Sequence, residues 1–500
     1  MPDQSDAAEP GVLDDGLDPA IRALADPAGL AIGGGAGGLP KGALAWSLYE
    51  GARDPYVILI TIYIFQPYLA TVVAKNAVEG QTIVANIGII GGLFVALTGP
   101  LLGSSVEQIG RRKPLLLFVT ALMVPLIWSL WWAKPGGAGL SLLVTAAVIV
   151  GCNILFAYSE ILHNSMLTRA ATPRQAPHAS GLALSAGNFF SVFVLCFVLW
   201  AFALPGKVDW GFIPKAPLFG LNSLTHEPDR IVGPISAVLL AIGAVPLFLY
   251  TPDAPATGVG WAEAFTKGAQ GLWRTLKSLT GHVDAAIYLG SRMLYTDGMT
   301  ALLTFGGVYA AGVMHWGVLE LLFYGICLSV FAVIGGFFGA WLDSTLGPKR
   351  AVQIEILGSV ACMAAQLGMA RDRILFVLPF DAQAHAPLWN GPIFRTLPEV
   401  IYLTIGLGTA VFVCAQYASS RTLLTRLAPK GQTAAFFGLY ALSGTVTLWL
   451  GSLLVRIATG LFKTQQAGFA PIALLLVLGF LGMLFVRGGA ALKAGDEGAH

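Results

Sequence analysis

The sequence predicts an all-α membrane protein with twelve transmembrane helices arranged as two six-helix bundles. Three observations lead to this fold class: a series of long uncharged runs, basic residues concentrated in alternate gaps, and an internal repeat. Composition agrees, because charged residues make up 11% of the 500-residue chain and apolar residues 56%. Ordinary soluble domains are about 25% charged. The net charge of +2 gives no indication of nucleic-acid binding.

Twelve runs between Pro55 and Val486 contain no Asp, Glu, Lys or Arg. A bilayer core about 30 Å thick needs roughly 20 apolar residues per helix, and nearly all of the runs are long enough. The ninth is short, and it becomes adequate if it begins near Ala351 and carries Glu355 at its rim. In order, the runs are residues 55–74, 80–106, 114–133, 135–159, 175–206, 231–252, 298–319, 321–342, 356–370, 400–420, 431–455 and 464–486.

Basic residues gather in the short second, fourth, eighth and tenth gaps between these runs. They are Arg111, Arg112, Lys113, Arg169, Arg174, Lys349, Arg350, Arg421, Arg426 and Lys430. The first and third gaps hold one lysine each and the seventh holds none, although the longer fifth and ninth gaps also carry basic residues. Because short basic loops stay in the cytosol, both termini are predicted to be cytoplasmic.

Two segments of the chain repeat in register with the helix count. Residues 167–187 and 424–444 match without a gap, and the matched positions include Gly181 with Gly438 and Gly187 with Gly444. A second pair follows the second and eighth helices. There Gly103, Glu107, Gly110, Arg111 and Arg112 correspond to Gly339, Asp343, Gly347, Lys349 and Arg350. Repeats in the same orientation indicate two halves related by an axis along the membrane normal.

Five segments follow from this organisation. Residues 1–44 are acidic and then glycine-rich, which predicts a disordered cytosolic tail. Residues 45–252 and 284–488 are predicted to form the two six-helix bundles, and 489–500 a second cytosolic tail. In the linker 253–283, apolar residues recur at helical spacing opposite basic ones. This pattern is typical of an amphipathic helix on the membrane surface, and we interpret it as a tether that also covers apolar surface rather than as a regulatory element.

Several classes of function are excluded by missing motifs. The sequence has no HExxH, no Gly-x-Ser-x-Gly and no clustered His or Cys at metal-ligand spacing, so we expect neither an enzyme nor a metal or cofactor site. It also has no G-x-x-x-x-G-K-S/T phosphate loop, which excludes primary active transport. The remaining classes are a secondary transporter and a membrane protein that does not transport.

The loop after the second helix resembles that of the major facilitator superfamily. Its pattern there is G-x-x-x-D-R-x-G-R-R, and in this chain Glu107 takes the aspartate position and Gln108 the arginine position. We interpret Gly103, Glu107 and Gly110–Arg112, with Asp343, Lys349 and Arg350 in the second half, as gating loops. In such loops an acid and a basic run pair in one state of the transporter and separate in the other.

A narrower resemblance covers most of residues 46–455. It is carried by Trp46-x-x-Tyr49-Glu50, by Gly110–Pro114, by Arg292–Gly298, by Thr304–Gly312 and by Ser420-Arg421 with Gln432 and Phe436–Tyr440. These stretches are similar to the vacuolar amino-acid effluxer-like branch, whose eukaryotic members act in autophagy. Relatives commonly read W-x-x-Y-D-W-A-N-S-x-Y in the first helix, whereas Arg53-Asp54 replaces the Asn-Ser pair in this chain. We expect a bacterial member in the inner (plasma) membrane.

In the first helix, charged residues occur at i, i+3 and i+4. Glu50, Arg53 and Asp54 therefore share one face. One arginine between two acids leaves a carboxylate over, and this group is a candidate to bind a proton, Na⁺ or a cationic substrate group. Alternatively, the true span starts at Pro55 and the triplet lies at the cytosolic rim.

Two further places inside the spans carry charge, which is costly in a membrane and therefore a functional signal. In the fourth helix, Glu160 and His163 are i, i+3 neighbours that we expect to form one hydrogen-bonded pair, with Asn164 beside them. In the seventh, Arg292, Tyr295 and Asp297 precede the glycine-rich run 298–312, where close helix contact or local unwinding is expected. Further candidates are Gln416 and Tyr440.

These observations predict a secondary transporter that rocks two six-helix halves around a central site. The family resemblance implies a small polar solute, with amino acids first, and the buried acids suggest H⁺ as the coupling ion. We expect a monomer in the lipid bilayer without a nucleic-acid partner. Alternatives are a non-transporting sensor, a lipid-handling protein on the same scaffold, or a Na⁺-coupled sugar-type carrier.

Overall fold

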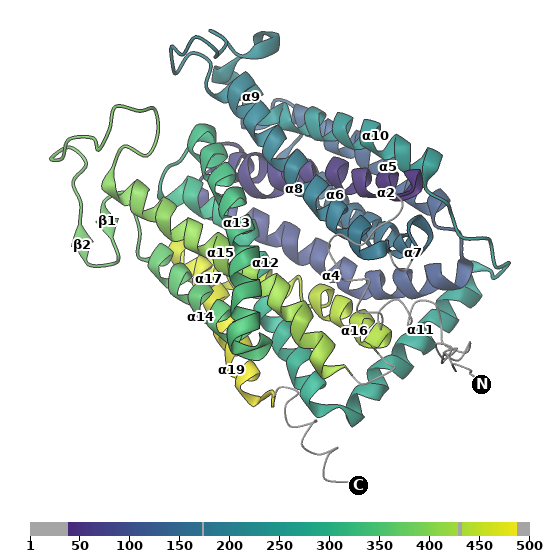
Figure 1. Cartoon of the computed structure of the whole chain (residues 1–500). Coiled ribbons are helices and arrows are strands. Elements are labelled where there is room, and N and C mark those ends of the chain that lie inside the picture. Colours follow the sequence, from purple (N-terminus) through teal and green to yellow (C-terminus); the bar gives the residue numbers. More distant parts are fainter. Residues whose placement is uncertain (1–38, 173–174, 429–432, 488–500) are drawn as a thin grey trace, which may run out of the picture.

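The computed structural model describes residues 39–172, 175–428 and 433–487, and these residues form a helical bundle (Figure 1). Ten helices in this part of the chain are long and apolar enough to cross a membrane. Two others, α12 (Val283–Val313) and α14 (Pro348–Leu367), pack among them but are less apolar. The predicted all-α fold is therefore confirmed, and the tails predicted at the two ends lie almost entirely outside the described residues.

The first half of the bundle contains the first six spans. They are Lys41–Val73 (α2, η2, α3 and η3), α4 (Ala77–Ile109), α5 with η4 (Lys113–Trp132), α6 (Leu142–Ser165), α8 with η6 (Ala176–Ala203), and α9 with α10 (Glu227–Tyr250). Shorter pieces of helix occupy the connections, namely η5 (Pro135–Gly137), α7 (Leu167–Ala170), η7 (Leu218–Gly220) and η8 (Ser223–Thr225).

The second half contains the other six spans. They are α12, α13 (Val318–Leu346), α14, α15 (Leu397–Leu427), α16 with α17 (Thr433–Thr445 and Leu450–Phe462), and α18 with α19 (Gln465–Phe469 and Pro471–Phe485). A two-stranded antiparallel hairpin, β1 (Arg373–Ile374) with β2 (Leu378–Pro379), lies in the loop before α15.

Three helices begin earlier than the uncharged runs predict. The first span starts at Lys41 rather than Pro55, and so includes residues assigned to the tail. The seventh starts at Val283, which places Arg292 and Asp297 inside the helix. The ninth starts at Pro348, and Glu355 is fully buried rather than at a rim. In each case the helix contains a charged residue. The prediction ends each span at such a residue, because it uses only runs without charge.

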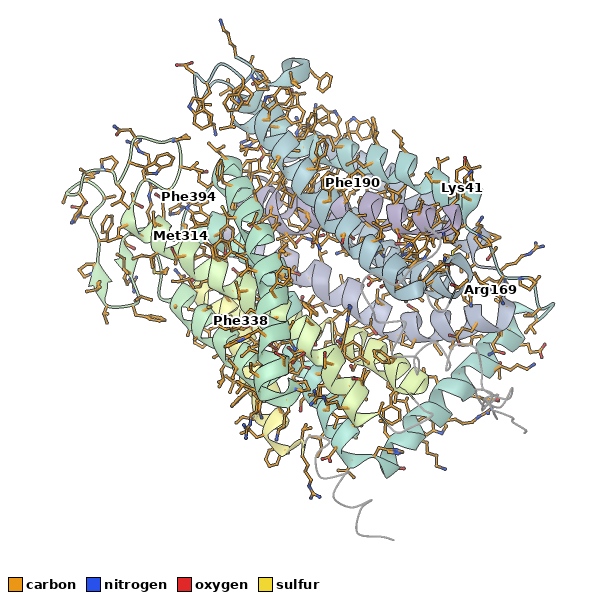
Figure 2. The ribbon with its side chains drawn as sticks, viewed as in Figure 1. Lys41, Arg169, Phe190, Met314, Phe338 and Phe394 are labelled. Atoms are coloured by element: carbon orange, nitrogen blue, oxygen red, sulfur yellow. The ribbon has the colours of Figure 1, made fainter. Side chains whose placement is uncertain are left out.

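The two ends of the bundle can be told apart by their residues. One end carries the basic loops 110–113 and 347–350, and we call it the basic end; the opposite end is the far end. Figure 2 shows Lys41 and Arg169 at the basic end and Met314 and Phe394 at the far end. All helical spans run between these two ends, as the packing of one long helix against the next requires.

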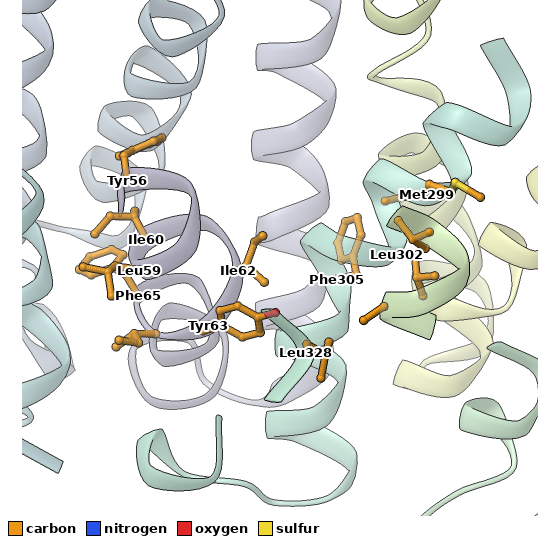
Figure 3. Close-up of a cluster of buried hydrophobic side chains, with 14 of the residues drawn as sticks. Tyr56, Leu59, Ile60, Ile62, Tyr63, Phe65, Met299, Leu302, Phe305 and Leu328 are labelled. Carbon is orange, nitrogen blue, oxygen red and sulfur yellow. The ribbon is translucent and has the colours of Figure 1, made fainter. Parts of the chain in front are cut away.

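The two halves meet toward the far end. A plug of buried apolar side chains from the first span, α12 and α13 lies there, including Tyr63, Phe305 and Leu328 (Figure 3). Gln81 of α4 donates to Thr459 Oγ1 (2.9 Å) and to the Gln465 carbonyl (3.2 Å), and Gln465 Nε2 donates to the Ala77 carbonyl. Every hydrogen bond seen between the halves, within the described ranges, belongs to this set. The far end is therefore closed.

Two spans depart from regular α geometry. After Pro55 the first span becomes a π-helix (η2, Tyr56–Tyr63), and a second π segment, η3, covers Leu69–Val73. The eleventh span breaks between α16 and α17, over residues 446–449. At this break Gly92 and Gly88 of α4 pack directly on Trp449 and Ser452. Such irregular turns inside helices are frequent at functional sites.

The linker between the halves forms one amphipathic helix, α11 (Trp261–Ser278). Gly268 packs closely against Ser104 of α4, so one side of α11 lies on the first half. Trp261, Phe265 and Trp273 are exposed. The helix thus has the predicted apolar side, free of protein cover in the described part of the chain, beside the basic end of the bundle (Figure 1).

Candidate functional site in two matched halves

The charged residues of the first span are buried against α6. Arg53 Nη2 donates to Glu50 Oε1 at 2.7 Å, and the arginine is only 2% exposed. Its guanidinium also lies over the Phe156 ring, 4.5 Å from the centroid. Glu50 and Arg53 therefore pair inside the helix bundle, whereas the rim alternative, which concerns the depth of the triplet in the bilayer, stays a prediction. Helical spacing of three residues brings the two side chains together.

His163 of α6 joins this pair to the first span. Its ring stacks on Trp46 with centroids 4.3 Å apart, and Trp46 Nε1 donates to the His163 carbonyl at 2.7 Å. In return, His163 Nε2 lies 2.8 Å from the Trp46 carbonyl. His163 Nδ1 is 3.2 Å from Glu50 Oε2, which is ion-pair distance without the alignment of a good hydrogen bond.

The contacts of His163 define where its protons are. A backbone carbonyl can only accept, so Nε2 must carry a proton to bond the Trp46 carbonyl. Two arrangements are then possible for Nδ1 and Glu50 Oε2. Without a further proton, a lone pair of Nδ1 faces a lone pair of the carboxylate oxygen; with one, the proton lies between the two atoms. Only the second arrangement is attractive. The geometry therefore favours a proton held between Glu50 and His163.

Two acids in the same region lack such partners. Asp54 packs against Gly187 of α8, and among the described residues none donates a hydrogen bond to it. Glu160 is exposed, and it acts electrostatically on both Arg53 and Asp54. The predicted Glu160–His163 pair is wrong: His163 turns to Glu50 on another helix. Asn164 is exposed and, among the described residues, forms no hydrogen bond with the cluster.

The second half holds its arginine differently. Arg292 Nη1 donates to the Tyr440 carbonyl (2.7 Å) and to Ser443 Oγ (2.6 Å), and its guanidinium lies 3.4 Å from the centre of the Tyr440 ring. Ser443 Oγ itself donates to the Tyr440 carbonyl. No carboxylate forms an ion pair with Arg292 in the described part of the chain, and its Nε has no partner. Arg292 is thus a buried cation that lacks a counter-ion.

A tyrosine and a glutamine of the second half converge on one serine. Tyr295 OH lies 3.0 Å from Ser420 Oγ, and Gln416 Nε2 donates to the same oxygen at 3.0 Å. Tyr288 OH donates to the Ser420 carbonyl. Gln416 Oε1 is buried and has no partner. These contacts tie α12 to α15, the first and fourth spans of this half, as Glu50 and His163 tie the first and fourth spans of the other.

Asp297 stands apart from Arg292 and caps the broken span. Its Oδ2 accepts from the Gly451 backbone N–H at 2.7 Å, at the start of α17. The first N–H groups of a helix have no partner within it, and a carboxylate there satisfies one of them and complements the helix dipole. The glycine-rich run of α12 stays helical, with close contact at Gly307 and Ile62. The unwinding occurs in the span that Asp297 caps.

The loop after α4 is held by the linker. The Asp253 carboxylate accepts from the backbone N–H groups of Arg112 (2.9 Å) and Lys113 (3.2 Å), and Thr257 Oγ1 donates to the Gln108 carbonyl. Partial burial lowers the pKa of Arg112, and the carboxylates of Glu107 and Asp253 oppose this shift. Glu107 and Asp343 form no ion pair among the described residues. The predicted gating role of these loops stays a prediction.

The internal repeat places one glycine beside the charged helix of each half. Gly187 of α8 lies against the Asp54 carboxylate, and the matched Gly444 of α16 lies beside the Arg292 guanidinium. A side chain at either glycine would meet the charged group. In each half, the repeated glycine therefore leaves space for a charged side chain on the first helix of that half.

Several residues of these clusters were not predicted as site residues. Asn153 Oδ1 accepts from Tyr56 OH at 2.7 Å, and Trp46 and Ser420 supply further contacts. The signal available for Asn153 and Ser420 was a polar residue inside an uncharged run. That signal is weak, because most such residues bond their own helix backbone.

Solved structures with this arrangement are transporters of the major facilitator type. A D-xylose-proton symporter aligns with a TM-score of 0.59 and 12% identity, covering 89% of this chain and 96% of its own. The nucleoside transporter NupG aligns at 0.57 and 12%, covering 89% and 100%. A bacterial homolog of the human lysosomal transporter Spinster, inward-facing and occupied, aligns at 0.55 and 15%, covering 89% and 95%. The chain therefore has the twelve-helix major facilitator fold.

The family is shown by sequence. The model described as "Vacuole effluxer Atg22 like" matches residues 178–494, more than half of the chain, and the chain belongs to this family. Autophagy-related protein 22 of Yarrowia lipolytica is 27% identical over 228 residues, which cover 44% of this chain and 34% of that protein. The Candida glabrata protein of the same name is 22% identical over 220 residues, covering 42% and 35%.

These comparisons confirm the predicted family and the predicted fold. The matched region spans about a third of the length of each fungal relative. Both of these relatives are fungal, so the expectation of a bacterial member in a bacterial inner membrane gains no support from them.

Proposed function

We propose that this protein is a secondary transporter that moves a small polar solute, an amino acid in the first instance, by alternating access of its two halves. The observation that carries the proposal is the pair of charged clusters buried in helices that lipid surrounds. Burying charge in such helices is expensive, and it persists where a substrate or ion uses it. The cluster of the first half joins its first and fourth spans, whereas Arg292, on the first span of the second half, is held by α16 of the fifth span.

The chemistry of the two clusters suits a zwitterion. Arg292 offers a cation without a carboxylate partner, and a guanidinium binds a carboxylate through parallel hydrogen bonds. Asp54 and Glu160 offer acids without hydrogen-bond donors, which suit an ammonium group. A free α-amino acid carries both charges. A solute that carries neither, such as a sugar, leaves these groups without partners.

We further propose that protons drive the transport cycle through Glu50 and His163. Arg53 neutralises one oxygen of Glu50, and the proton between Glu50 Oε2 and His163 Nδ1 joins the first span to α6. Loss of that proton leaves facing lone pairs and weakens this connection. Binding and release of one proton thus bias the position of the first span, which also forms part of the plug at the far end.

The test uses the full-length protein in liposomes. Uptake of radiolabelled amino acids is measured with and without an imposed pH gradient, and exchange between labelled and unlabelled solute is measured without one. The proposal predicts that acid on the side of entry stimulates uptake, and that H163Q and E50Q lose the stimulation while they keep exchange. R292M should lose both activities. E263Q, which changes an exposed acid on α11, is the control with wild-type behaviour.

Other results would favour a different function for the protein. Uptake that follows a Na⁺ gradient, or that occurs with sugars and not amino acids, would favour the sodium-coupled sugar carrier. Absence of transport for every solute in a broad panel would favour a sensor or lipid-handling protein on the same scaffold. Stimulation by a pH gradient that survives both H163Q and E50Q would remove these two residues from coupling and leave the transporter class standing.

Two finer features are also proposed. The basic loops support a cytosolic location for both termini, and the closed far end would then face away from the cytosol. We also propose that the protein acts as a monomer, because both charged clusters are built within one chain.

A further inference from the structure

One acid of the second half takes no part in the clusters described above. Glu355 lies in α14 with 0% of its surface exposed. Ser419 Oγ of α15 donates to its Oε1 at 2.7 Å, whereas Oε2 is buried and has no hydrogen-bond partner. A carboxylate ion in such a place needs several donors or a cation, because burial removes the water that would stabilise its charge. Glu355 has one donor.

The packing of α13 on α15 brings a second acid to the same place. Gly335 of α13 packs against Val411 of α15, and Gly339 packs against Ala415. Continuing this register by four residues, about one helical turn, places Asp343 at the level of Ser419. Asp343 acts electrostatically on Glu355, and Asp343 Oδ1 is also buried without a partner. Asp343 therefore lies at the same level of the bundle as the Glu355–Ser419 pair.

The surrounding charges do not neutralise these two acids. On α15, Arg421 and Arg426 are exposed, and neither forms an ion pair with Asp343 or Glu355. Lys349 and Arg350, in the first turn of α14, form none either. The third neighbour, α19, contains no titratable residue. Within the described residues, each of the two acids thus lacks a cation, although basic side chains lie nearby at the basic end.

No cation pairs with Glu355 in the described part of the chain, and the nearby Asp343 carboxyl opposes a negative charge on Glu355. We propose that Asp343 and Glu355 form a proton-binding site in the second half, which holds one proton on Glu355 Oε2. This site is separate from Glu50 and His163, and it lies where α13, α14 and α15 meet beside the 347–350 loop. Loss of the proton places two negative charges on helices joined by that loop and drives the helices apart.

Infrared spectroscopy of the purified full-length protein tests this site, because a protonated carboxyl group has a C=O stretching band that a carboxylate lacks. A pH titration is recorded for the wild type, E355Q, D343N and S419A. We expect E355Q to lose one carboxylic-acid component of the spectrum. S419A should keep that component at a higher wavenumber, since the carbonyl oxygen of Glu355 loses its hydrogen bond from Ser419. D343N should keep it and change the pH at which it disappears.

The control is E263Q, whose carboxyl is exposed and paired with Lys267, and whose spectrum should match the wild type. Should E355Q fail to fold, the shift in S419A still identifies Glu355 as the protonated group. An unchanged carboxylic-acid spectrum in E355Q and S419A would overturn the proposal. So would a component that disappears on adding NaCl and persists in choline chloride, because that result identifies a sodium site.

Discussion

The two halves share a framework and differ in how they hold their charges. In the first half Arg53 is paired with Glu50, and His163 extends the pair to the fourth span. In the second half Arg292 is held by a carbonyl, a hydroxyl and an aromatic ring. The repeated glycines, Gly187 and Gly444, occupy the same place beside each charged helix. Duplication therefore preserved the space, and the charges within it diverged.

This difference means that the charges of the two halves contribute differently to the stability of the fold and to transport. The charges of the first half stabilise one another, so removing one member leaves another without a partner. Arg292 of the second half forms no ion pair among the described residues, so its removal leaves no carboxylate without a partner. Replacing the arginine should accordingly affect mainly folding in the first half (Arg53) and mainly transport in the second half (Arg292).

The largest effect is expected for R53M. It leaves Glu50 without its arginine in a buried site, and breaking a buried ion pair in this way costs about 3–5 kcal/mol. The double variant E50Q/R53M should recover most of the loss, because the stranded charge is gone. Thermal and denaturant unfolding of the purified protein measure both values. A double variant no more stable than R53M would contradict the interpretation of the pair.

R292M provides the contrast. Ser443 still donates to the Tyr440 carbonyl, so neither group is left without a partner, and we expect a loss of about 1 kcal/mol. Equal destabilisation by R53M and R292M would show that the halves hold their arginines in the same way.

The matched glycines, Gly187 and Gly444, predict a further difference in the free energy of unfolding. An added methyl at Gly187 overlaps the Asp54 carboxylate, and G187A should cost about 1–3 kcal/mol, as overpacking does. At Gly444 the methyl would lie 3.1 Å from Arg292 Nη1, the movable end of a long side chain, so G444A should cost less. G181A and G438A are matched controls, since an added methyl at either meets nothing within 4 Å. Unfolding midpoints of the four variants rank these costs.

Asp297 and Asp54 allow a comparison of two buried acids. D297A removes the cap of α17 and should cost about 0.5–2 kcal/mol, whereas D297N keeps an acceptor and should cost less. D54N removes no hydrogen bond, and its stability should match the wild type. Equal stability of D297A and D54N would show that the cap does not stabilise the broken span.

The smallest effect is expected outside the spans, in a loop of the first half. His226 Nδ1 lies 3.1 Å from Asp229 Oδ2, and this hydrogen bond raises the pKa of His226. Its contribution to stability is present below the pKa of a free histidine, about 6.5, and is lost as pH rises through the folded value. The wild type should lose slightly more stability than H226Q across this range. Parallel pH profiles of the two proteins would argue against the contribution.

Sequence reasoning found the helices and the charged residues but not their partners. The spacing of Glu50 and Arg53 predicts their contact, because i, i+3 neighbours share a helix face. The same rule wrongly paired Glu160 with His163, since packing of the first span on α6 offers His163 a closer acid. Uncharged runs located the spans but began them late at Lys41 and Val283, where paired or capping charges lie inside helices. Glu355 and Ser419 meet only through tertiary packing, which no spacing encodes.

The plug at the far end has a consequence for how the protein changes state. Leu59, Ile62, Phe305 and Leu328 close the gap between the halves without an ion pair among them (Figure 3). Separating such surfaces exposes hydrocarbon to water, and that cost responds weakly to ionic strength and diminishes on cooling. Opening toward this side should therefore be insensitive to salt, and cold should populate the open form.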